Sequence, residues 1–243
     1  MHRFFAERVP ELGETGCLDP DESRHAHRVL RLRTGDLIEV VDGAGIRASA
    51  QVTGLPGAPR RPIVEFWVVR REELPPPVPE IRLCVAPPRP KAMALIVQQA
   101  TELGVARLSP VLCEYGVAKP LKQSALDHWR SEAISALKQS GNPRLPILDK
   151  PVEFARCLDT CAETRILFGA CAGDPGDTPD VAGARHLALW VGPEGGFSEA
   201  EQERLHQAGG HPVRIGPHIL RVETAATALL GWARGPWGVG ASS

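Results

Sequence analysis

The sequence feature that most constrains the fold is a pair of short apolar runs near the C-terminus, each followed by glycine and proline. Leu187–Val191 leads into Gly192–Phe197, and Val213–Ile215 leads into Gly216 and Pro217. Apolar runs of this length, separated by a helical pattern, are typical of buried parallel strands. Ligands of open α/β sheets bind beyond the carboxyl ends of the strands, where glycine lets backbone groups approach them. The pattern predicts two ligand-facing loops on neighbouring strands, although ordinary strand-to-helix turns would look similar.

Neither corner has the form of a common nucleotide-binding motif. A phosphate-binding P-loop carries Lys followed by Ser or Thr after its last glycine, whereas Gly192–Gly196 is followed by Phe197 and Ser198. A methyltransferase of the Rossmann type would carry its glycines after an early strand. Gly238–Gly240 lies in the tail, with no helix after it. These two kinds of nucleotide site are therefore not indicated.

A proline-rich stretch, Leu74–Pro79, divides the chain. Its prolines exclude a helix and an internal strand, so the stretch is a stiff extended spacer. A chain of 243 residues is long enough for two domains, each with its own core. We therefore expect a domain of residues 1–73, a linker of residues 74–79 and a domain of residues 80–243.

The residues before the spacer favour a small β-barrel. Asp36–Gly43, Ile46–Val52 and Ile63–Val69 predict short strands with glycine turns between them. Before them, the segment from Asp19 to Arg33 carries four arginines, two histidines and no acid between Arg24 and its end. We expect this segment to contact nucleic acid, although a solvated amphipathic helix would show the same pattern. If it is helical, its apolar stripe is Ala26, Val29 and Leu30, and its basic face is Arg24, Arg28 and Arg31.

Strand and helix patterns alternate after the spacer, which predicts an α/β domain with a largely parallel sheet. The predicted strands are Ile81–Ala86, Val105–Leu112 and Arg165–Phe168, besides the two apolar runs described above. The predicted helices are Lys91–Leu103, a helix that Ser124 and Asp127 cap and that ends near Gly141, and a helix with a Ser198–Glu201 capping box that reaches Gly209.

Composition limits the class of protein. The formal net charge is -1, so nucleic-acid binding would need a local basic patch. No run approaches the roughly 20 apolar residues of a membrane span, and the N-terminus lacks the apolar segment of a signal peptide. Six cysteines show no zinc-ligand spacing. We expect a cytoplasmic protein with buried thiols, without a metal and without a membrane partner.

Four further motifs accompany the two corners: His25–Arg31, Gln98–Val105, Gln139–Pro146 and Ile219–Ala225. Together they resemble the SPOUT superfamily of RNA methyltransferases, and within it the family that methylates N3 of a uridine in small-subunit (16S) ribosomal RNA. The resemblance covers nearly the whole chain. It implies a PUA-like barrel followed by a SPOUT-type α/β domain with a trefoil knot, an exception to the rule that chains do not knot.

The resemblance also implies S-adenosyl-L-methionine as cofactor, held by three loops and apolar walls. Glu194 could attract the sulfonium or cap the next helix. The expected cofactor-binding residues are Leu167, Phe168, Gly169, Leu189, Val191, Gly192, Pro193, Glu194, Gly195, Gly196, Ile215, Gly216, Ile219, Leu220, Arg221, Thr224 and Ala225. The expected RNA-binding residues are Arg24, His27, Arg28, Arg31, Arg33, Arg89 and Lys91.

Methyl transfer to N3 of uridine requires a base that removes the N3 proton or a cation that stabilises the resulting anion. Arg221 and Arg144 are the candidate cations and Glu223 is a candidate base. A structural salt bridge between Arg221 and Glu223 is the alternative. Two positions depart from the family pattern: Gln99 replaces a usual Lys and Asn142 a usual Arg, which softens the charge expected to face RNA.

The expected partners are 16S ribosomal RNA, within an assembled or nearly assembled small subunit, and a second copy of the chain in a homodimer. Two other functions fit the same residues. One is a knotted methyltransferase that acts on transfer RNA, and the other is an RNA-binding ribosome-assembly protein that has lost its chemistry.

Overall fold

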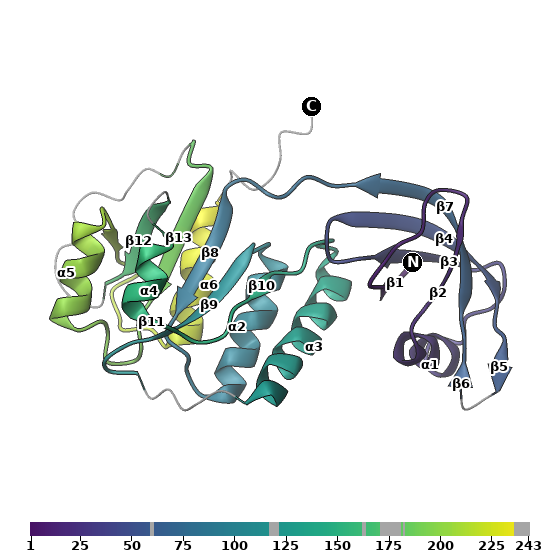
Figure 1. Ribbon diagram of the computed structural model, residues 1–243, viewed down its shortest axis with the longest axis horizontal. Helices are drawn as coiled ribbons and strands as arrows, with labels where there is room; N and C mark the ends of the chain where they lie inside the picture. Colours follow the sequence, from purple (N-terminus) through teal and green to yellow (C-terminus); the bar gives the residue numbers. More distant parts are fainter. Residues whose placement is uncertain (59–60, 117–121, 162–163, 171–180, 182, 236–243) are drawn as a thin grey trace. The chain divides into compact units, whose positions relative to one another are not determined.

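The computed structural model describes the chain except residues 59–60, 117–121, 162–163, 171–180, 182 and 236–243. The chain forms two compact units (Figure 1). The first comprises Met1–Pro76 together with Ile134–Leu145, and the second comprises Pro77–Ala133 together with the chain from Pro146 onward. Cys171 and the tail glycines Gly238–Gly240 lie outside the described residues.

A five-stranded sheet forms the first unit, in the order β1-β3-β4-β7-β2. Its strands are β1 (His2–Phe5), β3 (Leu37–Val41), β4 (Ile46–Gly54), β7 (Glu65–Glu73) and β2 (Thr15–Cys17). The β1–β3 pair is parallel and the other pairs are antiparallel. A separate two-stranded ribbon joins β5 (Gly57–Ala58) to β6 (Arg61–Pro62). The three predicted strands correspond to β3, β4 and β7, and the sequence analysis missed β1 and β2.

The helix of this unit, α1, is shorter than the sequence predicts and spans Pro20–Arg28. It begins after Asp19, whose carboxylate accepts hydrogen bonds from the backbone N–H groups of Asp21 and Glu22. Arg31 has a φ of 54°, which no α-helix allows. Val29 is 65% exposed, so it does not belong to an apolar stripe. The prediction of one basic helical face through Arg31 is therefore wrong.

The end of helix α3 (Gln123–Ser140) and the segment after it belong to the first unit. Leu137 is fully buried and packs with Phe5 and Val41. The backbone carbonyl of Lys138 accepts a hydrogen bond from Nη1 of Arg3 at 2.7 Å, and Nζ of Lys138 lies 2.5 Å from a carboxylate oxygen of Glu22. Residues 134–145, which the sequence analysis placed in the C-terminal domain, thus belong to the N-terminal unit and form a small apolar cluster with it.

A parallel sheet forms the second unit, in the order β10-β9-β8-β13-β12-β14, and β11 also pairs with β9. The strands are β8 (Glu80–Val85), β9 (Arg107–Leu112), β10 (Ile147–Leu148), β11 (Val152–Glu153), β12 (Arg165–Gly169), β13 (His186–Val191) and β14 (His211–Val213). The predicted parallel α/β domain is confirmed. The prediction that the two apolar runs form neighbouring strands is wrong, because β12 lies between β13 and β14.

Helices cover both faces of this sheet (Figure 1). Helices α2 (Pro90–Glu102) and α6 (Val222–Arg234) pack against each other, and α6 contacts β8 and β13. Helices α4 (Phe154–Asp159) and α5 (Glu199–Gln207) share a buried cluster with Cys84, Phe168 and Trp190 on the other face. Successive strand residues alternate between the two faces, so every strand near the centre is buried on both sides.

Of the two predicted helix N-terminal caps, one is confirmed and the other is wrong. Ser198 and Glu201 form the predicted capping box of α5, which is confirmed. Ser124 and Asp127 lie inside the first turns of α3, where Asp127 accepts a hydrogen bond from the side chain of Gln123. The predicted cap at Ser124 is therefore wrong, since the helix already includes Gln123.

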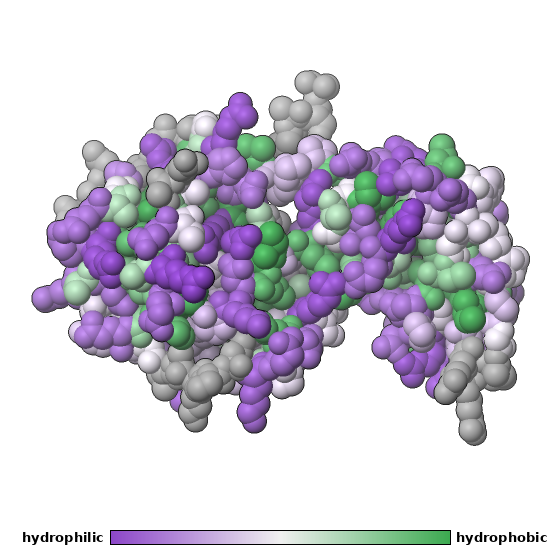
Figure 2. Space-filling model, viewed as in Figure 1, coloured by the Kyte–Doolittle hydropathy of each residue, from purple (hydrophilic) through white to green (hydrophobic). Residues whose placement is uncertain are grey.

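The face of the molecule shown in Figure 2 is mostly hydrophilic, with hydrophobic side chains in small groups. Within the described ranges, no helix combines the length and the apolar character that a membrane crossing requires.

Candidate active site

A pocket of the second unit lies at the carboxyl ends of β12, β13 and β14, where open parallel sheets bind their ligands. Gly169 and Ala170 follow β12, the segment from Val191 to Gly196 follows β13, and the segment from Val213 to Leu220 follows β14. Because β12 separates the other two strands, its glycine end lies between the two corners. Helix α6 completes the wall with Val222, Ala225 and Leu229.

The corner after β13 is tightly fixed. The backbone N–H of Gly196 donates to the carbonyl of Pro193 at 2.8 Å, and Gly196 has a φ of 77°, which favours glycine. A Cβ atom at Gly192 would lie 3.2 Å from the backbone nitrogen of Phe197, so the fold itself requires a small residue there. Glu201 accepts hydrogen bonds at 2.9 Å from the backbone N–H groups of Ser198 and of Glu114. The corner is therefore held from the α5 side and from the chain after β9.

Ten of the seventeen expected cofactor-binding residues line this pocket: Gly169, Val191, Gly192, Pro193, Glu194, Gly196, Ile215, Ile219, Leu220 and Ala225. Four others, Gly195, Gly216, Arg221 and Thr224, are sequence neighbours of its lining without being part of it. A Cβ atom at Gly195 would instead meet the side chain of Tyr115 at 3.5 Å. The structure thus brings together residues from all three predicted loops.

Three expected residues cannot use their side chains in the pocket. Leu167 and Leu189 are 0% exposed, and Phe168 packs its ring against Phe197 and His206. The prediction that Leu189 supplies an apolar wall is corrected, because its side chain belongs to the core of the sheet. The predicted loops thus lie at the pocket, but these three side chains point into the core and not into the pocket.

Six residues of the pocket were not anticipated: Ala170, Val213, Arg214, His218, Val222 and Leu229. The sequence did contain a pattern from which some of these pocket residues could have been predicted. Val222, Ala225 and Leu229 are spaced by three and four residues, which places them on one face of a helix. Val213 ends its strand two residues before the predicted run ends, so the corner starts at Arg214.

Besides Arg214, three charged residues that the sequence analysis singled out lie at or beside the pocket. Glu194 is exposed in the lining, and its capping alternative is wrong because Ser198 and Glu201 cap α5. Arg221 is the exposed residue just before α6, and Glu223 is half-buried in the first turn of that helix. In the part of the chain that the structure describes, no ion pair joins Arg221 to Glu223. The Arg221 guanidinium and the Glu223 carboxylate are therefore not paired with each other.

The third candidate for catalysis, Arg144, has a structural role in the first unit. Its guanidinium donates to the backbone carbonyls of Ala44 and Leu74 at 2.5 Å each. A Cβ atom at Gly45 would collide with this guanidinium. The side chain of Asn142 brackets Arg144, accepting a hydrogen bond from its N–H and donating to its carbonyl. The expectation that Arg144 supplies a catalytic fork is corrected, because both terminal nitrogens already hold the backbone.

The residues expected to bind RNA lie at the surface. Arg24, His27, Arg28, Arg31 and Arg33 are exposed on α1 and the segment that follows it in the first unit. Arg24 pairs with Asp21, three residues earlier on the same helix. In the second unit, Arg89 and Lys91 are exposed at the start of α2.

The cysteines are mostly buried, as the sequence analysis expected. Cys84, Cys113, Cys157 and Cys161 are buried, but Cys17 is exposed, so the expectation fails for that thiol. Among the described side chains, no group of three His, Cys, Asp or Glu residues is arranged to hold a metal ion.

Comparison with known proteins identifies both units. Residues 75–234 match the family model of an RNA methyltransferase domain, and residues 18–57 match that of an RNA methyltransferase PUA domain. The chain is 30% identical to the ribosomal RNA small subunit methyltransferase E of Mycobacterium bovis, across 94% of this chain and 89% of the relative. Its identity to the Bacillus subtilis protein of that name is 28%, across 93% of each chain.

Solved structures agree with these matches. The ribosomal RNA small subunit methyltransferase E of Neisseria gonorrhoeae, bound to S-adenosyl methionine, has a TM-score of 0.81 and is 28% identical, with coverage of 96% of this chain and 97% of that one. A probable rRNA-methyltransferase from Porphyromonas gingivalis has a TM-score of 0.82 at 26% identity, with 96% of each chain covered. The predicted resemblance is confirmed, and the chain belongs to the ribosomal RNA small subunit methyltransferase E family of RNA methyltransferases.

Proposed function

We propose that this protein transfers a methyl group from S-adenosylmethionine to N3 of a uridine in small-subunit ribosomal RNA. The observation that carries the proposal is the pocket that three strand ends of the SPOUT-type sheet share. Relatives named for small-subunit ribosomal RNA, and a similar structure bound to S-adenosyl methionine, support the substrate and the cofactor.

The pocket residues fit S-adenosylmethionine. The lining combines the glycine backbone of Gly169 and Gly192 with apolar side chains such as Val191, Leu220 and Leu229. A Cβ atom at Gly169 would meet only the carbonyl of Trp190, at 3.8 Å, so space is open where a ligand can approach the backbone. Glu194 adds a negative charge that suits a sulfonium, and such a mostly apolar lining suits an adenosine better than a polyphosphate.

When bound, S-adenosylmethionine supplies an electrophilic methyl group. The task of the protein is to present uridine N3 without its proton, since the N3 lone pair must form the new bond. Arg221 is an exposed guanidinium beside the pocket and would stabilise the negative charge that spreads over the two uridine carbonyls. Glu223, two residues later, is the candidate that accepts the N3 proton. We assign the binding of the cofactor to the residues that line the pocket.

RNA binding would use the basic surface of each unit. The exposed residues Arg31 and Arg33 follow α1, while Arg89 and Lys91 begin α2. Phosphate contacts release counterions, so replacing Arg31 by Asn and Arg33 by Gln should flatten the salt dependence of RNA binding by about one unit of slope for each lost contact. Asn is chosen at Arg31 because it tolerates a positive φ.

Two assembly features belong to the proposal. We expect a homodimer formed through the second unit, and 16S ribosomal RNA in an assembled or nearly assembled small subunit as the substrate, in the cytoplasm. Light scattering that gives the mass of one chain at micromolar concentration would contradict the dimer. The trefoil knot at α6 stays a prediction.

The direct test is methyl transfer in vitro with radiolabelled S-adenosylmethionine. Purified small subunits, free small-subunit ribosomal RNA and transfer RNA, each from a strain lacking this protein, should be compared as substrates. We expect label in 3-methyluridine of the small subunit. Label in transfer RNA alone would instead favour the transfer RNA alternative, and no label in any RNA would favour the non-catalytic one.

A further inference from the structure

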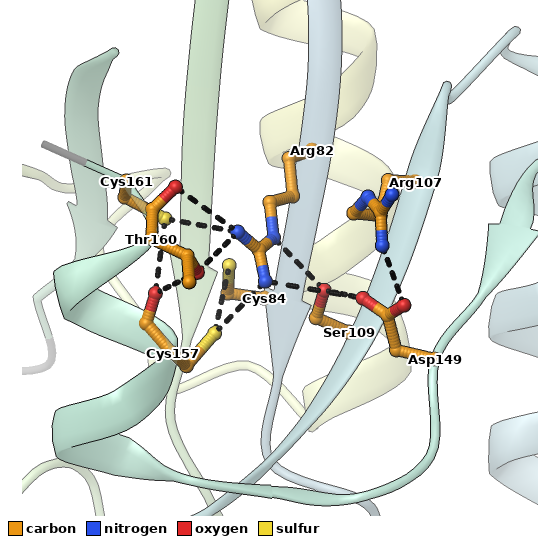
Figure 3. A network of polar contacts seen from close by, with 8 residues as sticks. All are labelled: Arg82, Cys84, Arg107, Ser109, Asp149, Cys157, Thr160 and Cys161. Atoms are coloured by element: carbon orange, nitrogen blue, oxygen red, sulfur yellow. Dashed lines mark hydrogen bonds and ion pairs between the residues drawn. The ribbon is translucent and has the colours of Figure 1, made fainter. Parts of the chain in front are cut away.

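Three buried thiols meet one guanidinium on the α4 face of the second unit (Figure 3). Cys84 lies in β8, Cys157 in α4 and Cys161 just after α4, and each is 0% exposed. The sulfur atoms of Cys84 and Cys157 are 3.7 Å apart. Arg82 Nη1 lies 3.6 Å from the sulfur of Cys161, and Arg82 Nη2 lies 3.6 Å from the sulfur of Cys157. This contact between thiols and a cation is not explained by the methyl-transfer pocket.

The guanidinium is fixed in position. Its Nε donates to Oγ of Ser109 at 2.9 Å, and its Nη1 donates to Oγ1 of Thr160 at 2.7 Å. Ser109 in turn donates to the carboxylate of Asp149 at 2.6 Å. Burial by itself lowers the pKa of Arg82, but the negative potential of the three cysteines and of Asp149 outweighs it and raises that pKa. Arg82 therefore remains a cation next to the sulfur atoms.

The cysteines have different tendencies to lose their protons. Hydrogen bonds from Cys157 and Cys84, together with the charge of Arg82, lower the pKa of the Cys161 thiol. Burial raises the pKa of Cys84 and also that of Cys113, a buried thiol without an arginine hydrogen bond among the described contacts. The thiolate is the nucleophilic form of cysteine, so Cys161 is the reactive member.

A polar cavity lies beside the cluster. Its lining includes Arg82, which contacts two of the sulfur atoms, and Thr160, which accepts a hydrogen bond from Arg82. Arg107, Asp149, Lys150, Glu153 and Arg156 also belong to the lining, but none of the three cysteines does. A small polar oxidant in this cavity therefore has to pass Arg82 and Thr160 to reach the sulfur atoms. A metal cation does not suit the same place, because the Arg82 guanidinium is already in contact with two of the three sulfur atoms.

We propose that Cys84, Cys157 and Cys161 form a redox-active cluster that hydrogen peroxide oxidises to one intramolecular disulfide. The Cys161 thiolate attacks one peroxide oxygen, the O–O bond breaks, and the departing hydroxide takes up a proton to become water. Cys161 is then a sulfenic acid. The thiol of Cys157 or Cys84 attacks its sulfur, the S–O bond breaks, and the hydroxyl group leaves with the thiol proton as a second water.

In total, two thiols and one peroxide give one disulfide and two waters. The disulfide joins Cys161 to Cys157 or to Cys84, and its two sulfur atoms have to approach to about 2.05 Å. This modification does not rest on the proposed methyl transfer.

The test uses the full chain with Cys17→Ser and Cys171→Ser, which removes the exposed thiol and the thiol outside the described residues. After treatment with hydrogen peroxide, mass spectrometry of the digested protein should find one disulfide among Cys84, Cys157 and Cys161, with Cys113 unmodified. Absence of a disulfide in the cluster, or equal oxidation of Cys113, would overturn the proposal. This measurement needs no substitution within the core.

Variants then identify the reactive thiol. In Cys84→Ser/Cys157→Ser the sulfenic acid of Cys161 has no thiol partner, so dimedone should label Cys161. Labelling elsewhere or nowhere, in a variant whose circular dichroism matches the parent, would contradict the assigned role. Arg82→Lys keeps a charge but not the planar fork, and should slow the peroxide reaction about tenfold and shift its pH profile upward. An unchanged rate and profile would show that Arg82 does not activate the cluster.

Discussion

The two corners that frame the pocket are built differently. After β13, the segment Gly192–Gly196 is fixed by an internal turn, by contact with Phe197 and by the capping box of α5. After β14, the chain is exposed through Gly216–Ile219, and Ile219 is 75% exposed. The first corner is therefore held by contacts with the rest of the fold, while the second lies at the surface. A glycine-proline pattern therefore predicts where a loop lies but not how many contacts hold it.

The strand end between the corners should show the largest effect. Gly169→Val places a branched side chain in the pocket, where a Cβ atom meets only the carbonyl of Trp190 at 3.8 Å, so the fold should tolerate it. We expect calorimetry to detect no S-adenosylmethionine binding, a loss of about 100-fold or more. Gly231→Ala, on the exposed side of α6, is the matched control and should bind normally. Wild-type affinity in Gly169→Val would place the cofactor elsewhere.

Arg221 tests whether the exposed corner carries the chemical step. Arg221→Ala should lower single-turnover methylation by about 100-fold, with RNA affinity nearly kept, if the guanidinium stabilises charge only in the transition state. Arg221→Lys should restore little, because a point charge does not replace a planar fork. Arg144→Ala is the contrasting variant, since it should mainly reduce the stability of the first unit. A loss of RNA affinity alone in Arg221→Ala would contradict this role.

The fixed corner should respond to the loss of its support. Glu201→Ala leaves the backbone N–H groups of Ser198 and Glu114 without their carboxylate partner. Ser198 is buried and Glu114 is exposed, so we expect the free energy of unfolding to fall by about 1–3 kcal/mol, the cost of one orphaned buried donor. Ile219→Ser, in the exposed corner, should change stability by less than about 0.5 kcal/mol. If urea titrations gave the same loss of unfolding free energy for both variants, the two corners would not differ in how the fold holds them.

The start of a helix could be predicted where two residues close in sequence determine it. Ser198 and Glu201 fixed the start of α5 because each side chain serves the other's backbone. The strand order was not predictable in this way, because the insertion of β12 between β13 and β14 depends on non-local pairing. Residues 134–145 likewise gave no local sign that Leu137 packs with Phe5 in the first unit.

The position of the candidate pocket was predictable to the level of its loops. Glycines indicated the three strand ends, because glycine allows the backbone conformations that sharp turns after a strand require. Side-chain roles were less predictable, because they depend on partners distant in sequence. Arg144 was expected to supply a catalytic cation but holds Ala44 and Leu74, which lie about 100 and 70 residues away. The cluster of Cys84, Cys157 and Cys161 was missed for the same reason, as β8 and α4 meet only in the folded chain.

The measurement that tests the central claim most directly is a map of modified nucleotides in small-subunit ribosomal RNA from a strain lacking this protein. Mass mapping should show that one uridine has lost its N3 methyl group, that the wild-type chain restores it, and that Gly169→Val does not. An unchanged map of the ribosomal RNA in the deletion strain would contradict the account.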